Sequence, residues 1–147
     1  MASHVLDNAK EQLLLGTIDF STDDIRVALL MTNTTADTEK GAATVAGYTT
    51  VDDFDGTGYT AGGAALAGEA VTEDTGNNRG EFDATNLTFS SLGAGTRQIA
   101  GALVYKFVTN FNSSIPIAWI DTGGFPVTAN GGDITITWNA EGILQLT

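Results

Sequence analysis

The sequence contains no cysteine, a single histidine and only six basic residues, and each shortage narrows what the chain can do. Without cysteine there are no disulfides, no thiolate metal ligands and no cysteine nucleophiles. The one histidine, His4, is predicted to lie on a surface helix near the start of the sequence, where it does not suit a catalytic triad. We therefore expect no catalytic residues, and we expect that the protein is not an enzyme.

Long apolar runs are missing as well. No run approaches the roughly 18 residues that a membrane-spanning helix requires. Residues 1–20 include acidic side chains and lack the basic region followed by an apolar block that marks a signal peptide. We expect neither membrane insertion nor export through a signal peptide.

Basic residues are too few to balance the acidic ones. The chain has 18 acidic residues against six basic residues, which gives a formal net charge of -12 at pH 7. Nucleic-acid binding depends on clustered Lys and Arg that replace the counterions of the phosphates. DNA and RNA are therefore not expected partners.

One acidic segment of the sequence partly resembles a metal-binding motif. The segment 52–58 holds three aspartates around glycines, which suggests a calcium-binding loop. Counted from Asp53 as an EF-hand loop, Asp55 fits a ligand position, but Ala64 stands where that loop requires its last glutamate. The sequence has no HExxH motif and no Walker lysine motif. We predict a solvated acidic loop and expect no metal ion and no other cofactor.

The sequence predicts one domain, residues 1–147, with a helix at its N-terminal end. A composition that is 42% hydrophobic is sufficient to bury a core in a chain of 147 residues. Apolar residues at spacings of three and four, closed by Gly16, predict one short helix within residues 1–16. The apolar stripe consists of Val5, Leu6, Ala9, Leu13 and Leu14. It either packs on the chain's own domain or anchors the chain on a neighbouring subunit.

Runs of β-branched and apolar residues predict about seven strands. They cover residues 25–31, 69–72, 81–89, 98–108, 115–120, 133–138 and 143–146. A turn at 76–80 predicts a hairpin, and the runs at 98–108 and 115–120 are expected to pair as another. Strict alternation directs Ile134, Ile136 and Trp138 inward. We predict a mainly β fold, a single antiparallel β-sandwich of the jelly-roll type with one short N-terminal helix.

Residues 32–68 are predicted to form a long loop region with one or two short strands. The segment is dominated by Thr, Ala, Gly and Asp, with isolated apolar residues. A long loop in a compact domain is usually functional or held in place by a partner. We therefore predict that a protein interface is formed by apolar residues of the helix and of this loop region. These are Val5, Leu6, Leu13, Tyr48, Phe54 and Tyr59.

Three stretches resemble a family of small virion proteins of tailed phages. They are Gly16–Phe20 followed by Asp24–Leu30, then Gly56–Gly63, and finally Trp138–Thr147. Members of that family often have a proline where this chain has Asn139, a difference confined to a turn. The resemblance implies a place in the virion, as a capsid decoration (cement) protein, a head fibre or a tail component, and it implies no catalytic residues.

The acidic composition favours one of these places. A protein of this charge suits the outside of a capsid, because inside it would face packaged DNA of the same sign. We expect a capsid decoration protein, made in the bacterial host cytoplasm and located on the outer surface of the virion, that binds the major capsid protein as a homotrimer. One alternative is a tail or fibre-attachment component that binds tail proteins. Another is a glycan-binding module that recognises host sugars through exposed aromatic residues.

Overall fold

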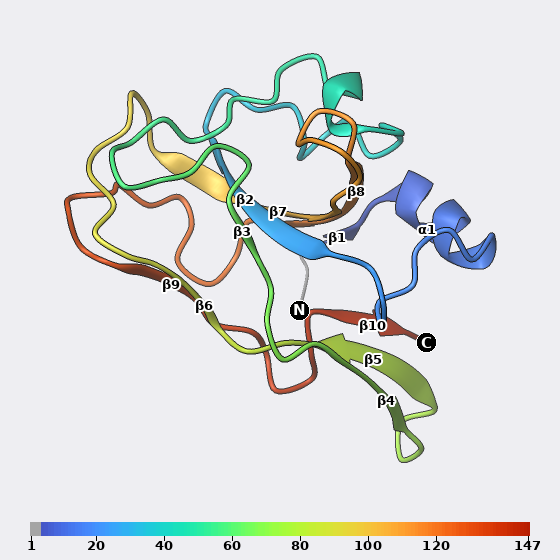
Figure 1. Ribbon diagram of the computed structural model, residues 1–147. Coiled ribbons are helices and arrows are strands. Elements are labelled where there is room, and N and C mark those ends of the chain that lie inside the picture. The colour runs from blue at the N-terminus through green and yellow to red at the C-terminus, as the bar shows by residue number, and fades with distance from the viewer. Residues whose placement is uncertain (1–3) are drawn as a thin grey trace.

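The computed structural model describes residues 4–147 as antiparallel sheets with one short α-helix near the N-terminus (Figure 1). The elements are β1 His4–Val5, α1 Asp7–Leu14, β2 Ile25–Met31, the 3₁₀ turn η1 Val45–Gly47, β3 Ala64–Ala65, β4 Ala70–Asp74, β5 Arg79–Asp83, β6 Leu87–Phe89, β7 Ile99–Lys106, β8 Ile115–Ile120, β9 Ile134–Ile136 and β10 Leu144–Leu146. They form a five-stranded sheet in the order β1-β8-β7-β2-β3, a three-stranded sheet β10-β5-β4 and a two-stranded sheet β6-β9. The predicted mainly β, antiparallel architecture is confirmed.

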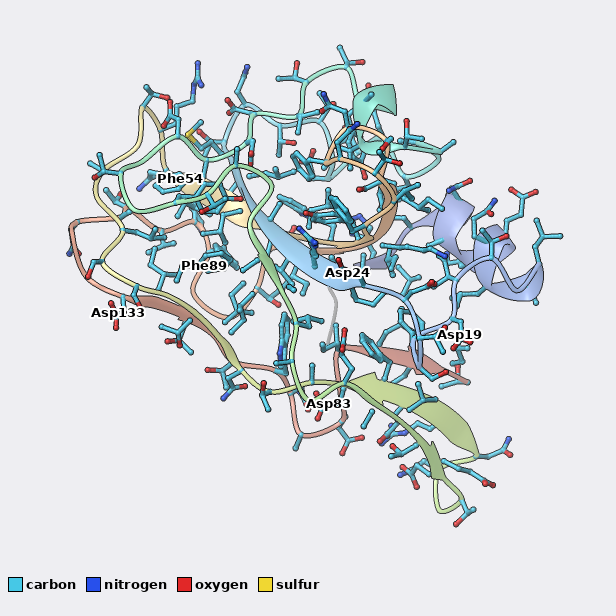
Figure 2. All side chains as sticks on the ribbon, viewed as in Figure 1. Asp19, Asp24, Phe54, Asp83, Phe89 and Asp133 are labelled. Atoms are coloured by element: carbon cyan, nitrogen blue, oxygen red, sulfur yellow. The ribbon has the colours of Figure 1, made fainter. Side chains whose placement is uncertain are left out.

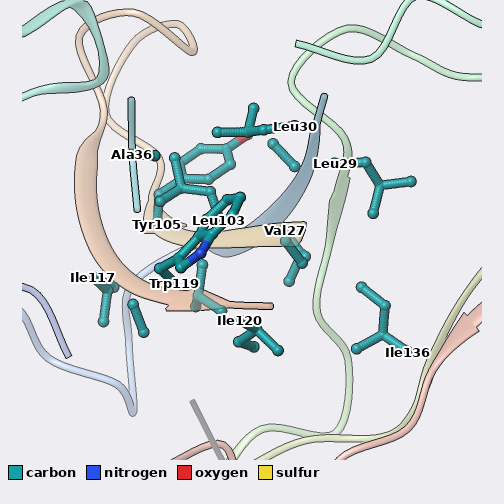
Figure 3. Close-up of a cluster of buried hydrophobic side chains, with 14 of the residues drawn as sticks. Val27, Leu29, Leu30, Ala36, Leu103, Tyr105, Ile117, Trp119, Ile120 and Ile136 are labelled. Atoms are coloured by element: carbon teal, nitrogen blue, oxygen red, sulfur yellow. The ribbon is translucent and has the colours of Figure 1, made fainter. Parts of the chain in front are cut away.

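The five-stranded sheet contains the centre of the hydrophobic core. Strands β2 and β7 pair along almost their whole length, with Ala28 opposite Leu103, and β8 continues the sheet beside β7. Nearly every side chain of these strands is buried, as expected for strands that are covered on both faces. Figure 3 shows Leu103, Tyr105 and Trp119 at the middle of this cluster. The predicted strands at 25–31, 98–108 and 115–120, and the pairing of the last two, are confirmed.

The predicted run 81–89 forms two strands in different sheets. Strand β5 pairs with β4 as the predicted hairpin, whereas β6 pairs with β9. The chain changes sheet between them because Thr85 donates its N–H to the carbonyl of Ala67 at 2.8 Å, and Asn86 accepts the N–H of Trp138 through its side chain at 3.0 Å. The interruption is therefore produced by hydrogen bonds to segments that are distant in the sequence.

The N-terminal helix is shorter than the apolar pattern predicts. Val5 belongs to β1 and lies opposite Ala118 of β8, and Leu6 donates its N–H to the carbonyl of Ile117 at 2.9 Å. Helix α1 begins only at Asp7, so the prediction that His4, Val5 and Leu6 are helical was wrong: His4 and Val5 form β1, and the N–H of Leu6 bonds to β8. Residues 1–3 of the predicted helical segment lie outside the described residues. No helix within residues 4–147 is long and apolar enough to span a bilayer.

The loop region 32–68 is mostly irregular, as predicted, and contains only η1 and β3 as regular elements. It is held by its own chain. Val45 donates its N–H to the carbonyl of Ser114 at 3.0 Å, and Phe54 donates its N–H to the carbonyl of Leu29 at 2.9 Å. Tyr48 is also buried. Contacts with the body of the same chain therefore position this segment.

Candidate docking surfaces

The six residues predicted to form an interface lie in the chain's own core or at its margin. Leu6, Tyr48 and Phe54 are buried, while Val5, Leu13 and Tyr59 are half-buried and pack against the core. The structure does not bring the six together as one exposed patch. Their assignment to a partner interface stays a prediction, because it concerns contacts with a second chain.

A half-buried carboxylate connects the loop region to β2. Asp53 accepts the O–H of Tyr59 at 2.9 Å and the N–H of Gly62 at 2.7 Å, one on each carboxylate oxygen. The hydroxyl oxygen of Tyr59 in turn accepts the N–H of Leu29 in β2 at 2.9 Å. Burial raises the pKa of Asp53, and the hydrogen bonds from Gly62 and Tyr59 oppose that effect. The network fixes residues 53–62 against the core sheet.

We predict that Asp53 and Asp55 affect stability with opposite dependence on pH. Burial holds the pKa of Asp53 above its ordinary value of 3.8, whereas hydrogen bonds from Thr96 hold the pKa of Asp55 below it. The stability advantage of the native chain over Asp53→Ala, about 1–3 kcal/mol for the unpaired donors, is full below pH 3.8 and declines as pH rises through the folded pKa. Its advantage over Asp55→Ala is full above pH 3.8 and is lost as pH falls.

Urea unfolding of the three proteins between about pH 3 and pH 7 measures both differences, since linkage ties each pH slope to a difference in bound protons. Each variant serves as the control for the other, because the global charge changes equally in both. Parallel pH profiles for the two variants would contradict the opposite directions in which the pKa values of Asp53 and Asp55 are shifted.

The acidic loop 52–58 does not gather its carboxylates around one point. Asp52 pairs with Arg97 at 2.9 Å, Asp53 bonds to Tyr59, and Asp55 accepts hydrogen bonds from Thr96. The three side chains therefore have separate partners, and each of them fixes a different part of the fold.

Carboxylates do converge on the three-stranded sheet. Within residues 4–147, oxygens of Asp74, Glu81 and Glu141 lie within 4.8 Å of one another. The guanidinium of Arg79 lies among them, 3.0 Å from Asp74 and 2.7 Å from Glu81, and it also pairs with Glu141. Because Arg79 supplies a positive charge at this point, the group is an ion-pair network that ties the hairpin to the segment before β10.

The opposite face of this sheet exposes two apolar side chains beside a carboxylate, and we call Val71, Glu73, Gly80 and Leu146 the hairpin face. Val71 lies opposite Phe82, and Gly80 lies opposite Leu146, so all of these residues share one side of the sheet. Phe82 is buried, but Val71 is 57% exposed and Leu146 is 54% exposed. Figure 1 shows the β4–β5 hairpin projecting from the body of the molecule. The core face of the sheet therefore continues outward as a surface that carries the exposed side chains of Val71 and Leu146 together with Glu73.

A groove of about 570 Å³ lies along β9, and we call it the β9 groove. Its lining residues are Ile120, Thr122, Gly123, Gly124, Phe125, Val127, Asp133, Ile134, Thr135, Ile136, Thr137, Trp138 and Asn139. Ile136 and Trp138 are buried, as the alternating pattern predicted, while Ile134 is half-buried. Figure 2 shows Asp133 beside β9, on the side of the molecule away from the hairpin. The hairpin face and the β9 groove are thus separate surfaces.

Comparison with known proteins identifies no relative. No protein-family model matches the chain, no curated protein matches its sequence, and no solved structure matches its fold. The described residues form an antiparallel β protein with an acidic composition and two candidate docking surfaces, the hairpin face and the β9 groove.

Proposed function

We propose that this chain is a non-enzymatic structural protein of a tailed-phage particle, a decoration protein on the outer surface of the head. The observation that carries the proposal is the hairpin face, where Val71 of the projecting β4–β5 hairpin and Leu146 of the adjacent strand β10 are more than half exposed. Neighbouring apolar side chains exposed in this way are typical of protein contact sites. The motif stretches that end at Gly63 and Thr147 indicate the virion as the setting of that contact.

The electrostatics favour the outside of the particle. With a net charge of -12, the chain is repelled by packaged DNA and suits a surface that faces solvent. The proposal includes a homotrimer that bridges neighbouring subunits of the major capsid protein, because closed cyclic symmetry lets one small surface hold several subunits. It also includes the three sheets acting as parts of one jelly-roll-like β-sandwich.

Replacing Val71 by aspartate is expected to weaken binding to phage heads by at least about tenfold, because it places a charge in an apolar contact. The free protein should keep its melting temperature, since exposed positions usually change stability by less than about 0.5 kcal/mol. Val108→Asp is the matched control, because Val108 is 50% exposed on the loop after β7, outside the hairpin face. Co-sedimentation with heads prepared without the protein measures the binding.

Electron microscopy of the same particles decides the position. Density on the head surface that is lost with Val71→Asp and kept with Val108→Asp supports the proposal. Density on the tail alone favours the tail or fibre-attachment alternative. Undiminished binding by Val71→Asp overturns the role of the hairpin face, and binding to a glycan array without binding to particles favours the glycan-binding alternative.

A further inference from the structure

We infer that the β9 groove binds an extended segment of a partner protein, in which apolar residues alternate and Lys or Arg residues flank the run, and that this segment adds a strand to β9. The inference goes beyond the proposed function, because it concerns a different surface and holds whether or not the partner is a capsid protein. It rests on the backbone of β9, the apolar lining of the groove and the charge around it.

The backbone of β9 has a free edge. One edge pairs with β6, with Ile136 opposite Leu87, and the N–H of Trp138 is directed to the same side, where it bonds to Asn86. Successive N–H groups of an extended chain point to opposite edges, so we infer that those of Thr135 in β9 and of Thr137, the residue after β9, point away from β6. Within residues 4–147 neither N–H has a hydrogen-bond partner outside that pairing. Both residues line the groove, so an added strand finds unpaired backbone groups there.

The groove also offers apolar contacts at the spacing that a strand presents. Among the lining residues, Ile134, Ile136 and Trp138 follow one another at every second position, and Phe125 and Val127 add further apolar side chains. Side chains of an extended segment alternate with the same period, so every second residue of a bound segment meets apolar surface. The volume of about 570 Å³ lies within the range of ordinary ligand sites.

The acidic charge near the groove favours a bound segment with basic residues on either side of its apolar run. Residues 107–147 contain acidic residues and no Lys or Arg, and Asp133 is the charged residue of the groove lining. A segment with acidic flanks is repelled, as is a second copy of this chain with its net charge of -12. A segment flanked by Lys or Arg is complementary. The occupant is therefore a basic, extended peptide of another protein.

Synthetic peptides test the inference on the whole chain. The probe is a peptide in which valine and threonine alternate between paired lysines. One control peptide carries glutamates in place of the lysines, and a second carries prolines in place of the threonines, which removes the N–H groups that an added strand donates. We expect the lysine-flanked peptide to bind about tenfold more tightly than either control in low salt. Amide NMR should show Thr135 and Thr137 protected from hydrogen exchange on binding.

A single substitution tests how much the backbone N–H of residue 137 contributes to peptide binding. Thr137→Pro removes the N–H on the free edge, and because that N–H serves no bond with β6, the fold should remain intact. Thr137→Val keeps the N–H and is the matched control. Peptide binding should fall about tenfold with proline and stay within about twofold with valine. Circular dichroism and melting temperature establish that both variants are folded.

Three outcomes overturn the inference. They are equal binding of the lysine-flanked and proline-containing peptides, equal binding by the two Thr137 variants, and protection of amides outside 133–139 without protection of Thr135 and Thr137. Should Thr137→Pro fail to fold, the peptide controls and the protection pattern of the native chain still decide. Displacement of the peptide by soluble oligosaccharides, or concentration-dependent self-association through the groove, would assign the site to another occupant and likewise overturn the inference.

Discussion

Replacing Gly63 by alanine is expected to cost more than about 4 kcal/mol of stability or to prevent folding altogether. A Cβ at this position would lie 1.8 Å from the carbonyl oxygen of Val27 and 2.8 Å from the Cα of Ala28. Both contacts are with the backbone of β2, which pairs with β3 at Ala64 and has no room to move. The backbone at Gly63 also has a φ of 78°, which is unfavourable for a side chain.

Gly123→Ala measures the energetic cost of a side chain at positive φ alone, without the steric overlap that a Cβ would cause at Gly63. Gly123 has a φ of 73°, but no atom lies within 4 Å of the position that its Cβ would occupy. Alanine there should cost only about 1–2 kcal/mol. Urea unfolding of both variants measures the difference, and equal losses would contradict the close contact between β2 and the residue before β3.

Replacing Leu6 by alanine is expected to lower stability by about 2–5 kcal/mol, the usual loss for a fully buried leucine. Leu6 is 0% exposed and joins β1 to α1, so its side chain fixes the start of the helix on the body of the protein. Leu14→Ala is the matched control, because Leu14 lies at the end of the same helix and is 90% exposed. We expect a change of less than about 0.5 kcal/mol there.

These two variants also decide between the two uses of the apolar stripe considered from the sequence. Thermal unfolding measures stability, and binding to particles measures docking. Loss of stability in Leu6→Ala with binding kept by the folded fraction establishes the start of the stripe as core. Unchanged stability in Leu6→Ala would contradict its burial in the free chain.

The sequence predicted the strands and the pairing within two hairpins, but it did not predict the pairings between segments that are distant in the chain. The runs at 25–31 and 115–120 coincide with β2 and β8, because burial on both faces leaves a continuous apolar pattern that is local to each strand. The division of 81–89 was not predictable in this way. It depends on bonds from Thr85 and Asn86 to residues far along the chain, and no local pattern records them.

The candidate surfaces show the same limit. Tyr48 and Phe54 were predicted to belong to an interface because they are apolar residues in a polar segment. In the structure both are buried against the core. Val71 gave no such signal, since a valine in a predicted hairpin is expected to face inward. Val71 is exposed on β4, which is an edge strand of the three-stranded sheet. The β9 groove depends on which edge of a strand is left unpaired, and that is a property of the assembled sheets.

The pairing of β1 with β8 and of β5 with β10 has a consequence for the protein during its synthesis. Strands β1 and β5 are synthesised well before β8 and β10, with which they pair. One edge of β5 is therefore unpaired until β10 has been made. Folds that depend on such distant pairings form slowly, and unpaired edges in a nascent chain are points of aggregation. We therefore expect the open edge of β5 to be a point of aggregation in the nascent chain until β10 has been made.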